Sequence, residues 1–233
     1  MSLPKIETPV YRVKLSGIDK HIKYRAYTVK EEKLLLMAAE SKNPNEVMDT
    51  IMRLCQGCVL DDIKIEDLPV TDLEKLMIFI RSKSVGETAK VGLVCPHCEQ
   101  KTDMNINLEE VTEVGDPSIE NNIMLNDTYG VQLKPPTLLS VKQNISSQED
   151  AINNAIMSVV DCVYDNENIY KFDDYTDEER LEFIDNLSIE NARKITEEYV
   201  DKLPKNVIKL NYTCPHCKKE VSKEMDNVID FFT

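Results

Sequence analysis

The tetrapeptide Cys-Pro-His-Cys occurs twice in this chain, at residues 95–98 and at residues 214–217. In each copy two residues separate the two cysteines, a spacing that turns both sulfur atoms toward one point. Two such pairs supply the four thiolates that tetrahedral Zn²⁺ prefers, at Zn–S distances of about 2.3 Å. We therefore predict one structural Zn²⁺ ion, held by Cys95, Cys98, Cys214 and Cys217.

The segments that precede the two tetrapeptides also match each other. Val91 and Leu93 alternate with other residues before the first copy, and Ile208, Leu210 and Tyr212 do so before the second. Alternation of this kind predicts strands, so each tetrapeptide should lie at the tip of a β-hairpin, as in a zinc ribbon. The alternative interpretation, two unrelated redox or core turns, does not explain the matching flanks.

Other cysteines and histidines have a structural explanation. Cys55 and Cys58 form a third Cys-x-x-Cys, which could be a redox motif or core packing. The motif lies in a helical apolar pattern, and Val159 takes the place of Cys55 in the second half of the chain, which favours core packing. His97 and His216 lie inside the tetrapeptides, where four cysteines already complete a zinc shell, so we expect solvent-facing or second-shell side chains.

The sequence does not indicate catalysis. The chain has three histidines and six glycines, which leaves no base beside a nucleophile and no glycine-rich phosphate loop. The acidic residues between 173 and 179 crowd a predicted helix start, where carboxylates favour the helix dipole. A four-cysteine site has no open position for a reacting water. We predict that the protein is not an enzyme and has no catalytic or cofactor-binding residues beyond the zinc ligands.

Composition narrows the possible environments and partners. The 233 residues carry a net charge of −14, which argues against a protein that binds the phosphate backbone of nucleic acids. Seven cysteines, an odd number, fit metal-bound thiolates in a reducing compartment better than a disulfide framework. We expect no membrane span, because no run of eighteen apolar residues occurs, and the first residues lack the apolar core of a signal peptide.

The charge is unevenly distributed along the chain. Residues 1–34 hold eight Lys/Arg and four Asp/Glu, whereas residues 161–201 hold four Lys/Arg and fourteen Asp/Glu. Two solvated faces of opposite sign would explain this difference. Complementary docking, between copies of the chain or with a partner, is the alternative.

The order of predicted elements recurs in the two halves. Each half has a hairpin, then helices, then a strand that leads into Cys-Pro-His-Cys. We predict an α+β fold of two similar hairpin-plus-helices repeats, joined by the four-cysteine zinc ribbon. The repeats should span residues 1–108 and 121–233, each with one zinc knuckle. Residues 109–120, which are polar and contain both Gly and Pro, should form the linker.

Capping residues predict where helices begin and end. The expected N-terminal caps are Thr28, Asn43, Thr71, Ser146, Thr176 and Ser188. The segment Cys58-Val59-Leu60-Asp61 matches Cys162-Val163-Tyr164-Asp165, and we expect both segments to close a helix.

Three stretches resemble the baseplate hub proteins of T4-like bacteriophages. They are Val10–Lys14, Lys23–Lys33 and Ile80–Glu87. The second Cys-Pro-His-Cys and the apolar tail at residues 228–232 are also consistent with this resemblance. Ala26 is one departure, because relatives are expected to have proline at this position.

The resemblance implies a non-catalytic subunit or assembly chaperone of the phage baseplate hub. Such a protein would bind other hub proteins, without nucleic acid, in the cytoplasm of the infected host during assembly. A subunit would then stay in the virion tail baseplate, whereas an assembly chaperone would not. The apolar tail would be either tucked onto its own repeat or offered to a partner. A zinc-ribbon adaptor for nucleic acid or transcription is the competing class, and the net acidity disfavours it.

Overall fold

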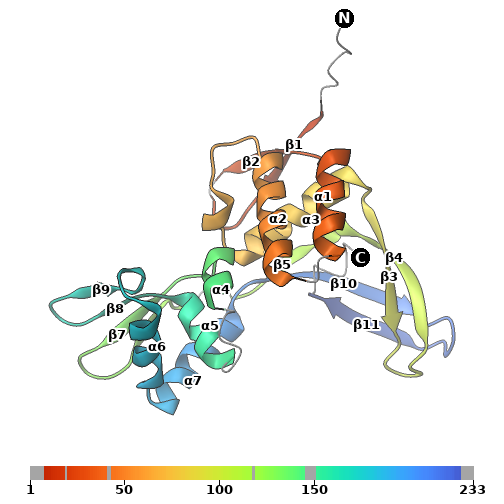
Figure 1. Cartoon of the computed structure of the whole chain (residues 1–233). Helices are drawn as coiled ribbons and strands as arrows, with labels where there is room; N and C mark the ends of the chain where they lie inside the picture. Colours follow the sequence, from red (N-terminus) through yellow and green to blue (C-terminus); the bar gives the residue numbers. More distant parts are fainter. Residues whose placement is uncertain (1–7, 19, 41–42, 117–118, 145–150, 227–233) are drawn as a thin grey trace, which may run out of the picture. The chain divides into compact units, whose positions relative to one another are not determined.

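The computed structural model describes residues 8–18, 20–40, 43–116, 119–144 and 151–226 (Figure 1). The chain forms two compact units, the first from residues 1–65, 71–114 and 205–233 and the second from residues 66–70 and 115–204. The expected cap Ser146 and the apolar tail at residues 228–232 lie outside the described residues.

The first unit begins with the predicted hairpin. Strands β1 (Val10–Lys14) and β2 (His21–Arg25) pair antiparallel. Helices α1 (Val29–Glu40), α2 (Pro44–Cys58) and α3 (Val70–Ser84) follow in the chain. One side of the hairpin is buried, because Val13, Ile22 and Tyr24 are each less than 5% exposed. The alternation seen in the sequence therefore identifies the inward face correctly.

Two further hairpins of the first unit carry the cysteine pairs. Strand β3 (Thr88–Val94) pairs with β4 (Lys101–Asn107), and β10 (Lys205–Thr213) pairs with β11 (Glu220–Met225). Apolar side chains of both hairpins and of α3 form one core. Its buried members are Ile78, Ala89, Val91, Leu93, Ile106, Leu108, Val111, Ile208 and Met225.

A short strand lies where the chain passes from the first unit to the second. Strand β5 (Thr112–Val114) pairs antiparallel with β10, with Val114 opposite Lys205. The chain enters the second unit after Val114 and re-enters the first at Lys205, so these two crossings are hydrogen-bonded neighbours. Part of the stretch at 109–120 thus forms a strand, and the division into two repeats stays a prediction.

The second unit has a four-stranded antiparallel sheet in the order β6-β7-β8-β9. The strands are β6 (Asn122–Met124), β7 (Gly130–Leu133), β8 (Val160–Tyr164) and β9 (Ile169–Lys171). Its helices are α4 (Leu138–Asn144), α5 (Ala151–Val159), α6 (Asp177–Asp185) and α7 (Ile189–Glu198). Sheet and helices share a second core, whose largest fully buried side chains include Leu133 and Tyr199.

Two expectations about helix ends are wrong. Cys162 does not close a helix, because α5 ends at Val159 and Cys162 lies in β8. Val160 and Val163 are β-branched and favour a strand, and β8 is stabilised here by its pairing with β7. Thr71 does not cap helix α3, because the helix begins at Val70 and Thr71 already lies in its first turn. The N–H of Val70, at the start of the helix, donates to the Pro136 carbonyl at 2.9 Å.

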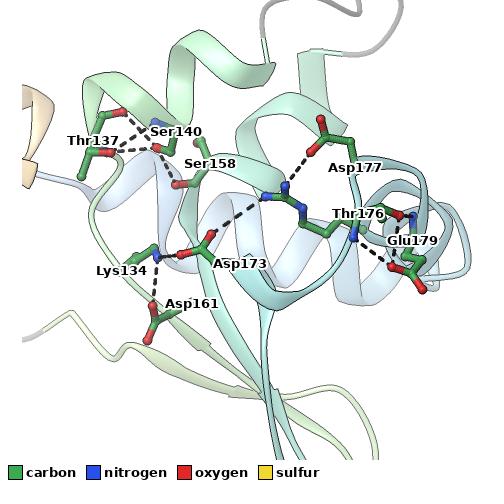
Figure 2. Close-up of polar contacts among 10 residues, drawn as sticks. Lys134, Thr137, Ser140, Ser158, Asp161, Asp173, Thr176, Asp177 and Glu179 are labelled. Carbon is green, nitrogen blue, oxygen red and sulfur yellow. Dashed lines mark hydrogen bonds and ion pairs between the residues drawn. The ribbon is translucent and has the colours of Figure 1, made fainter. Parts of the chain in front are cut away.

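Other predicted helix ends are confirmed. Thr176 and Glu179 form a reciprocal capping box at α6 (Figure 2), and Ser188 caps α7 by accepting the Asn191 N–H. At α1 the Glu31 carboxylate accepts the Thr28 N–H at 2.7 Å. This is one of the two hydrogen bonds of the predicted capping box, the one from the glutamate side chain to the backbone of the capping residue.

The connectivity of the two units has a common order. After each hairpin come two helices and then a segment that pairs with the hairpin's second strand. This segment is Val59, which bridges to Tyr24, in the first unit and β8 in the second. A short 3₁₀ turn follows in both, at Ile65–Asp67 and Phe172–Asp174. This shared order is what an internal duplication would produce, and the duplication stays a prediction.

Candidate metal centre

The four predicted cysteines lie together in the first unit. Their sulfur atoms all lie within 4.8 Å of one another. The Sγ atoms of Cys95 and Cys217 are 3.8 Å apart, and those of Cys98 and Cys214 are 3.7 Å apart. The β3–β4 turn supplies one pair and the β10–β11 turn supplies the other, as the alternating flanks predict.

The spacing of the sulfur atoms fits a tetrahedral ion. Four sulfurs at about 2.3 Å from a central ion are about 3.8 Å from each other, which is the edge of that tetrahedron. A disulfide would instead hold two sulfurs about 2 Å apart, and all four cysteines are free. The cluster can therefore hold a metal ion, and an all-thiolate tetrahedral donor set suits zinc or iron.

Matching backbone geometry positions the two pairs. The Glu99 N–H donates to the Cys95 carbonyl at 2.9 Å, and the Lys218 N–H donates to the Cys214 carbonyl at 2.9 Å. The first cysteine of each pair also donates its N–H to the carbonyl two residues beyond the second cysteine, at 3.1 and 2.9 Å. Glu99 and Lys218 have φ angles of 58° and 62°, in the left-handed region, where side chains with a Cβ are strained.

The electrostatics of the thiols differ within the cluster. Backbone N–H groups of Cys217 and His216, with the Cys217 bond the larger effect, lower the pKa of Cys214 to about 6. At Cys98 the Gln100 N–H lowers the pKa, but burial and the three neighbouring sulfurs outweigh it and raise the pKa to about 12. Four adjacent thiolates repel one another, so a divalent cation would stabilise the fully ionised set.

The cluster is partly shielded from solvent, because two of its cysteines are buried and two are half-buried. Cys95, Cys214 and Val221 are buried, and Tyr212 packs against them. The Tyr212 hydroxyl is buried without a hydrogen-bond partner among the described residues. Burial, followed by the neighbouring sulfurs, raises the pKa of Tyr212.

The two histidines of the tetrapeptides are exposed, as predicted. The third Cys-x-x-Cys is core, because Cys55 and Cys58 are both fully buried. Burial raises the pKa of Cys55 and raises that of Cys58 to about 11, which is opposite to the lowered pKa of a redox thiol. The Cys58 sulfur also accepts an N–H of Arg25 at 3.8 Å.

A family model described as T4 bacteriophage base plate protein matches residues 8–233, nearly the whole chain. The chain belongs to this family. The resemblance seen in its sequence is thereby confirmed at the level of the phage base plate. No curated protein and no solved structure matches the chain.

Sequence reasoning missed one feature of this base plate protein, an aromatic pocket in the second unit. Its walls include Tyr129, Tyr170, Phe172 and Phe183, which are spread over more than fifty residues. Each occupies an ordinary strand, turn or helix position, so the sequence pattern alone does not bring them together. Among the described residues, no helix is long and apolar enough to cross a membrane.

Proposed function

We propose that the protein is a non-catalytic structural or assembly component of the phage baseplate hub that binds other hub proteins. The family match over residues 8–233 carries this proposal. A subunit or chaperone of the hub would act in the host cytoplasm during tail assembly and, as a subunit, remain in the virion baseplate. Four thiolates would fill a tetrahedral metal shell and leave no position for a substrate, which supports a structural role for the metal.

The proposed metal is one structural Zn²⁺ held by Cys95, Cys98, Cys214 and Cys217. Cross-cluster sulfur pairs are 122 and 116 residues apart in sequence, so the ion would fasten two distant hairpins of the first unit. Structural zinc in small peptides binds with apparent free energies of about 10–16 kcal/mol, which become folding energy. The ion would therefore hold the hairpins in the rigid arrangement that a subunit of a large assembly needs.

The exposed face of α1 is the partner surface that we propose. Val29, Leu36 and Met37 are 68%, 60% and 66% exposed, although each is large and apolar. Positions 29, 36 and 37 fall on one side of a helix with 3.6 residues per turn, whereas Ala38 is buried. Three apolar side chains clustered on one helix face indicate a protein contact more strongly than scattered ones.

The test is a double variant, Leu36→Ser with Met37→Ser, placed in the phage gene. The α1 face is already exposed, so the thermal melting of the purified chain should change by less than a few degrees. Co-purification of hub proteins from infected cells should be lost, together with complete baseplates in electron micrographs. Ile189→Ser is the matched control, because Ile189 is 80% exposed at the start of α7.

If the double variant still forms normal baseplates, the exposed face of α1 is not the partner surface. Normal tails after deletion of the whole gene would overturn the assembly function itself. The competing adaptor function predicts binding to DNA or RNA with a steep salt dependence. Fluorescence anisotropy with labelled duplex DNA and single-stranded RNA, at low and at physiological salt, separates these two functions.

A further inference from the structure

The exposed face of α1 carries opposite charges on the two sides of its apolar centre. Lys33 precedes the apolar pair Leu36 and Met37 in the helix, and Glu40 follows it. Positions 33, 36, 37 and 40 recur at intervals of three and four residues, so the four side chains lie along one side of the helix. All four are exposed. Within the part of the chain that the structure describes, neither Lys33 nor Glu40 has an ion-pair partner.

Helix α2 extends this pattern, because it lies beside α1 and runs in the opposite direction (Figure 1). The start of α1 and the second half of α2 line a hollow of about 310 Å³, where Lys30 and Arg53 lie. Glu46 is seven residues before Arg53, on the same side of α2. It therefore lies toward the end of the helix pair where α1 finishes with Glu40.

A count of every charged residue gives the same polarity. The start of α1 and the second half of α2, taken as residues 25–34 and 50–57, hold four Lys/Arg and two Asp/Glu. The end of α1 and the start of α2, with the residues between them, are residues 35–49 and hold one Lys/Arg and three Asp/Glu. The two ends of the helix pair therefore have net charges of +2 and −2.

The fold of one chain does not explain the position of Glu40. This residue lies in the last turn of α1, which contains no basic residue. The negative end of the helix dipole is there, so a carboxylate is unfavourable unless a cation lies near it. Exposed Leu36 and Met37 would also gain from leaving water. A second molecule that brings a cation and an apolar surface would satisfy all three side chains.

We propose that this molecule is a second copy of the chain, whose α1 packs antiparallel against the first across a two-fold axis. An axis at Leu36 and Met37 buries these side chains against their own copies. Positions 33 and 40 are equally far from the midpoint between 36 and 37, so Lys33 of each copy meets Glu40 of the other. Each positive end then faces a negative end, and antiparallel helix dipoles also attract.

The charge pattern selects a second copy over other partners. A uniformly acidic or basic protein would match one end of the helix pair and be repelled by the other, whereas a second copy matches both. This inference rests on the proposed function, because it names the protein that contacts the exposed α1 face. The face is small, so the total buried area should fall below about 1,200 Å², and the dimer should dissociate on dilution.

Charge reversal tests the pairing in the purified full-length chain. Sedimentation equilibrium over an about hundredfold range of concentration should show a reversible monomer–dimer equilibrium for the wild type. Lys33→Glu sets carboxylate against carboxylate across the axis, and Glu40→Lys sets ammonium against ammonium, so each variant alone should dimerise at least about tenfold more weakly. Mixed in equal amounts, the two variants should form a heterodimer about as stable as the wild-type dimer.

The double reversal and a distant control complete the test. Lys33→Glu with Glu40→Lys in one chain should restore the dimer, because each reversed end again meets its complement. Lys202→Glu, an exposed reversal in the second unit, should leave dimerisation unchanged. A wild type that stays monomeric overturns the proposal and leaves the α1 face to another hub protein. A dimer that tolerates both single reversals overturns it too. Deletion of the gene tests the assembly function separately and has no bearing on this equilibrium.

Discussion

The ion pair between Arg25 and Glu31 gives a stability prediction that the structure specifies in detail. Arg25 donates to both carboxylate oxygens, at 2.9 and 2.7 Å, and its guanidinium also donates to the Gly57 carbonyl at 2.7 Å. The same carboxylate accepts the Thr28 N–H. One pair thus connects the end of β2, the start of α1 and the end of α2.

The magnitude follows from the ionisation of Glu31. The Arg25 hydrogen bonds, opposed in part by burial and aided by Thr28, lower the pKa of Glu31 from 4.5 to about 2. Each pKa unit is worth about 1.4 kcal/mol, so the carboxylate contributes roughly 3 kcal/mol at neutral pH. Its side chain is 18% exposed, so screening by solvent removes only part of this. We expect Glu31→Gln to lower the free energy of unfolding by about 2–3 kcal/mol at pH 7.

The sign of the pH dependence also follows. A lowered carboxyl pKa stabilises the fold fully above the unfolded-state pKa of 4.5, and this stabilisation disappears as the pH falls from 4.5 toward 2. The difference between wild type and Glu31→Gln should therefore shrink by about 1 kcal/mol between pH 7 and pH 4. Comparing the two proteins at each pH cancels any acid effect on the cysteine cluster.

Urea unfolding followed by circular dichroism measures both quantities. Glu197→Gln is the matched control, because Glu197 pairs with Arg193 on a helix surface and its side chain is 64% exposed. This variant should change the free energy of unfolding by less than about 0.5 kcal/mol at either pH. An equally small change for Glu31→Gln at pH 7, or a difference independent of pH, would refute the reasoning.

Three further predictions concern single positions. Cys55→Val should change the free energy of unfolding by less than about 1.5 kcal/mol, because buried Cys55 lies beside a gap of about 10 Å³ that helps to accommodate the slightly larger valine. The metal content should stay unchanged; thermal melting and elemental analysis measure the two outcomes. Lys218→Gly should be tolerated, whereas Lys218→Val should speed metal release to a chelator, because β-branched residues resist the left-handed φ of 62°. Asp72→Ala should cost about 2–3 kcal/mol in urea unfolding, because buried Asp72 accepts the N–H groups of Ser16 and Gly17 at 2.8 Å each.

Local signals in the sequence predict the cysteine cluster and much of the secondary structure. The cysteine spacing and the alternating flanks fix both hairpins, because ligand geometry and strand periodicity are short-range constraints. The capping box at Thr176 is local in the same sense, and it is confirmed. The sequence also indicates that the two cysteine pairs meet, because neither pair alone completes a tetrahedral shell.

What the sequence does not predict depends on long-range pairing. Val160 and Val163 would suit a buried helix as well as a strand, and only the ladder of β7 decides between them. The pairing of β5 with β10 joins residues about ninety positions apart, which no local pattern reports. The opposite charges at the two ends of the α1 and α2 pair likewise become visible only once the end of α2 is placed beside the start of α1.

The metal content of the purified protein tests the four-cysteine zinc site most directly. Elemental analysis of the full-length chain should give one zinc per chain, and Cys214→Ser should lose it while loosening the β3–β4 and β10–β11 hairpins in hydrogen exchange. Cys162→Ser is the matched control, because Cys162 lies in β8 outside the cluster, and it should keep the zinc. Protein without stoichiometric zinc, or zinc retained unchanged by Cys214→Ser, would contradict the four-cysteine site.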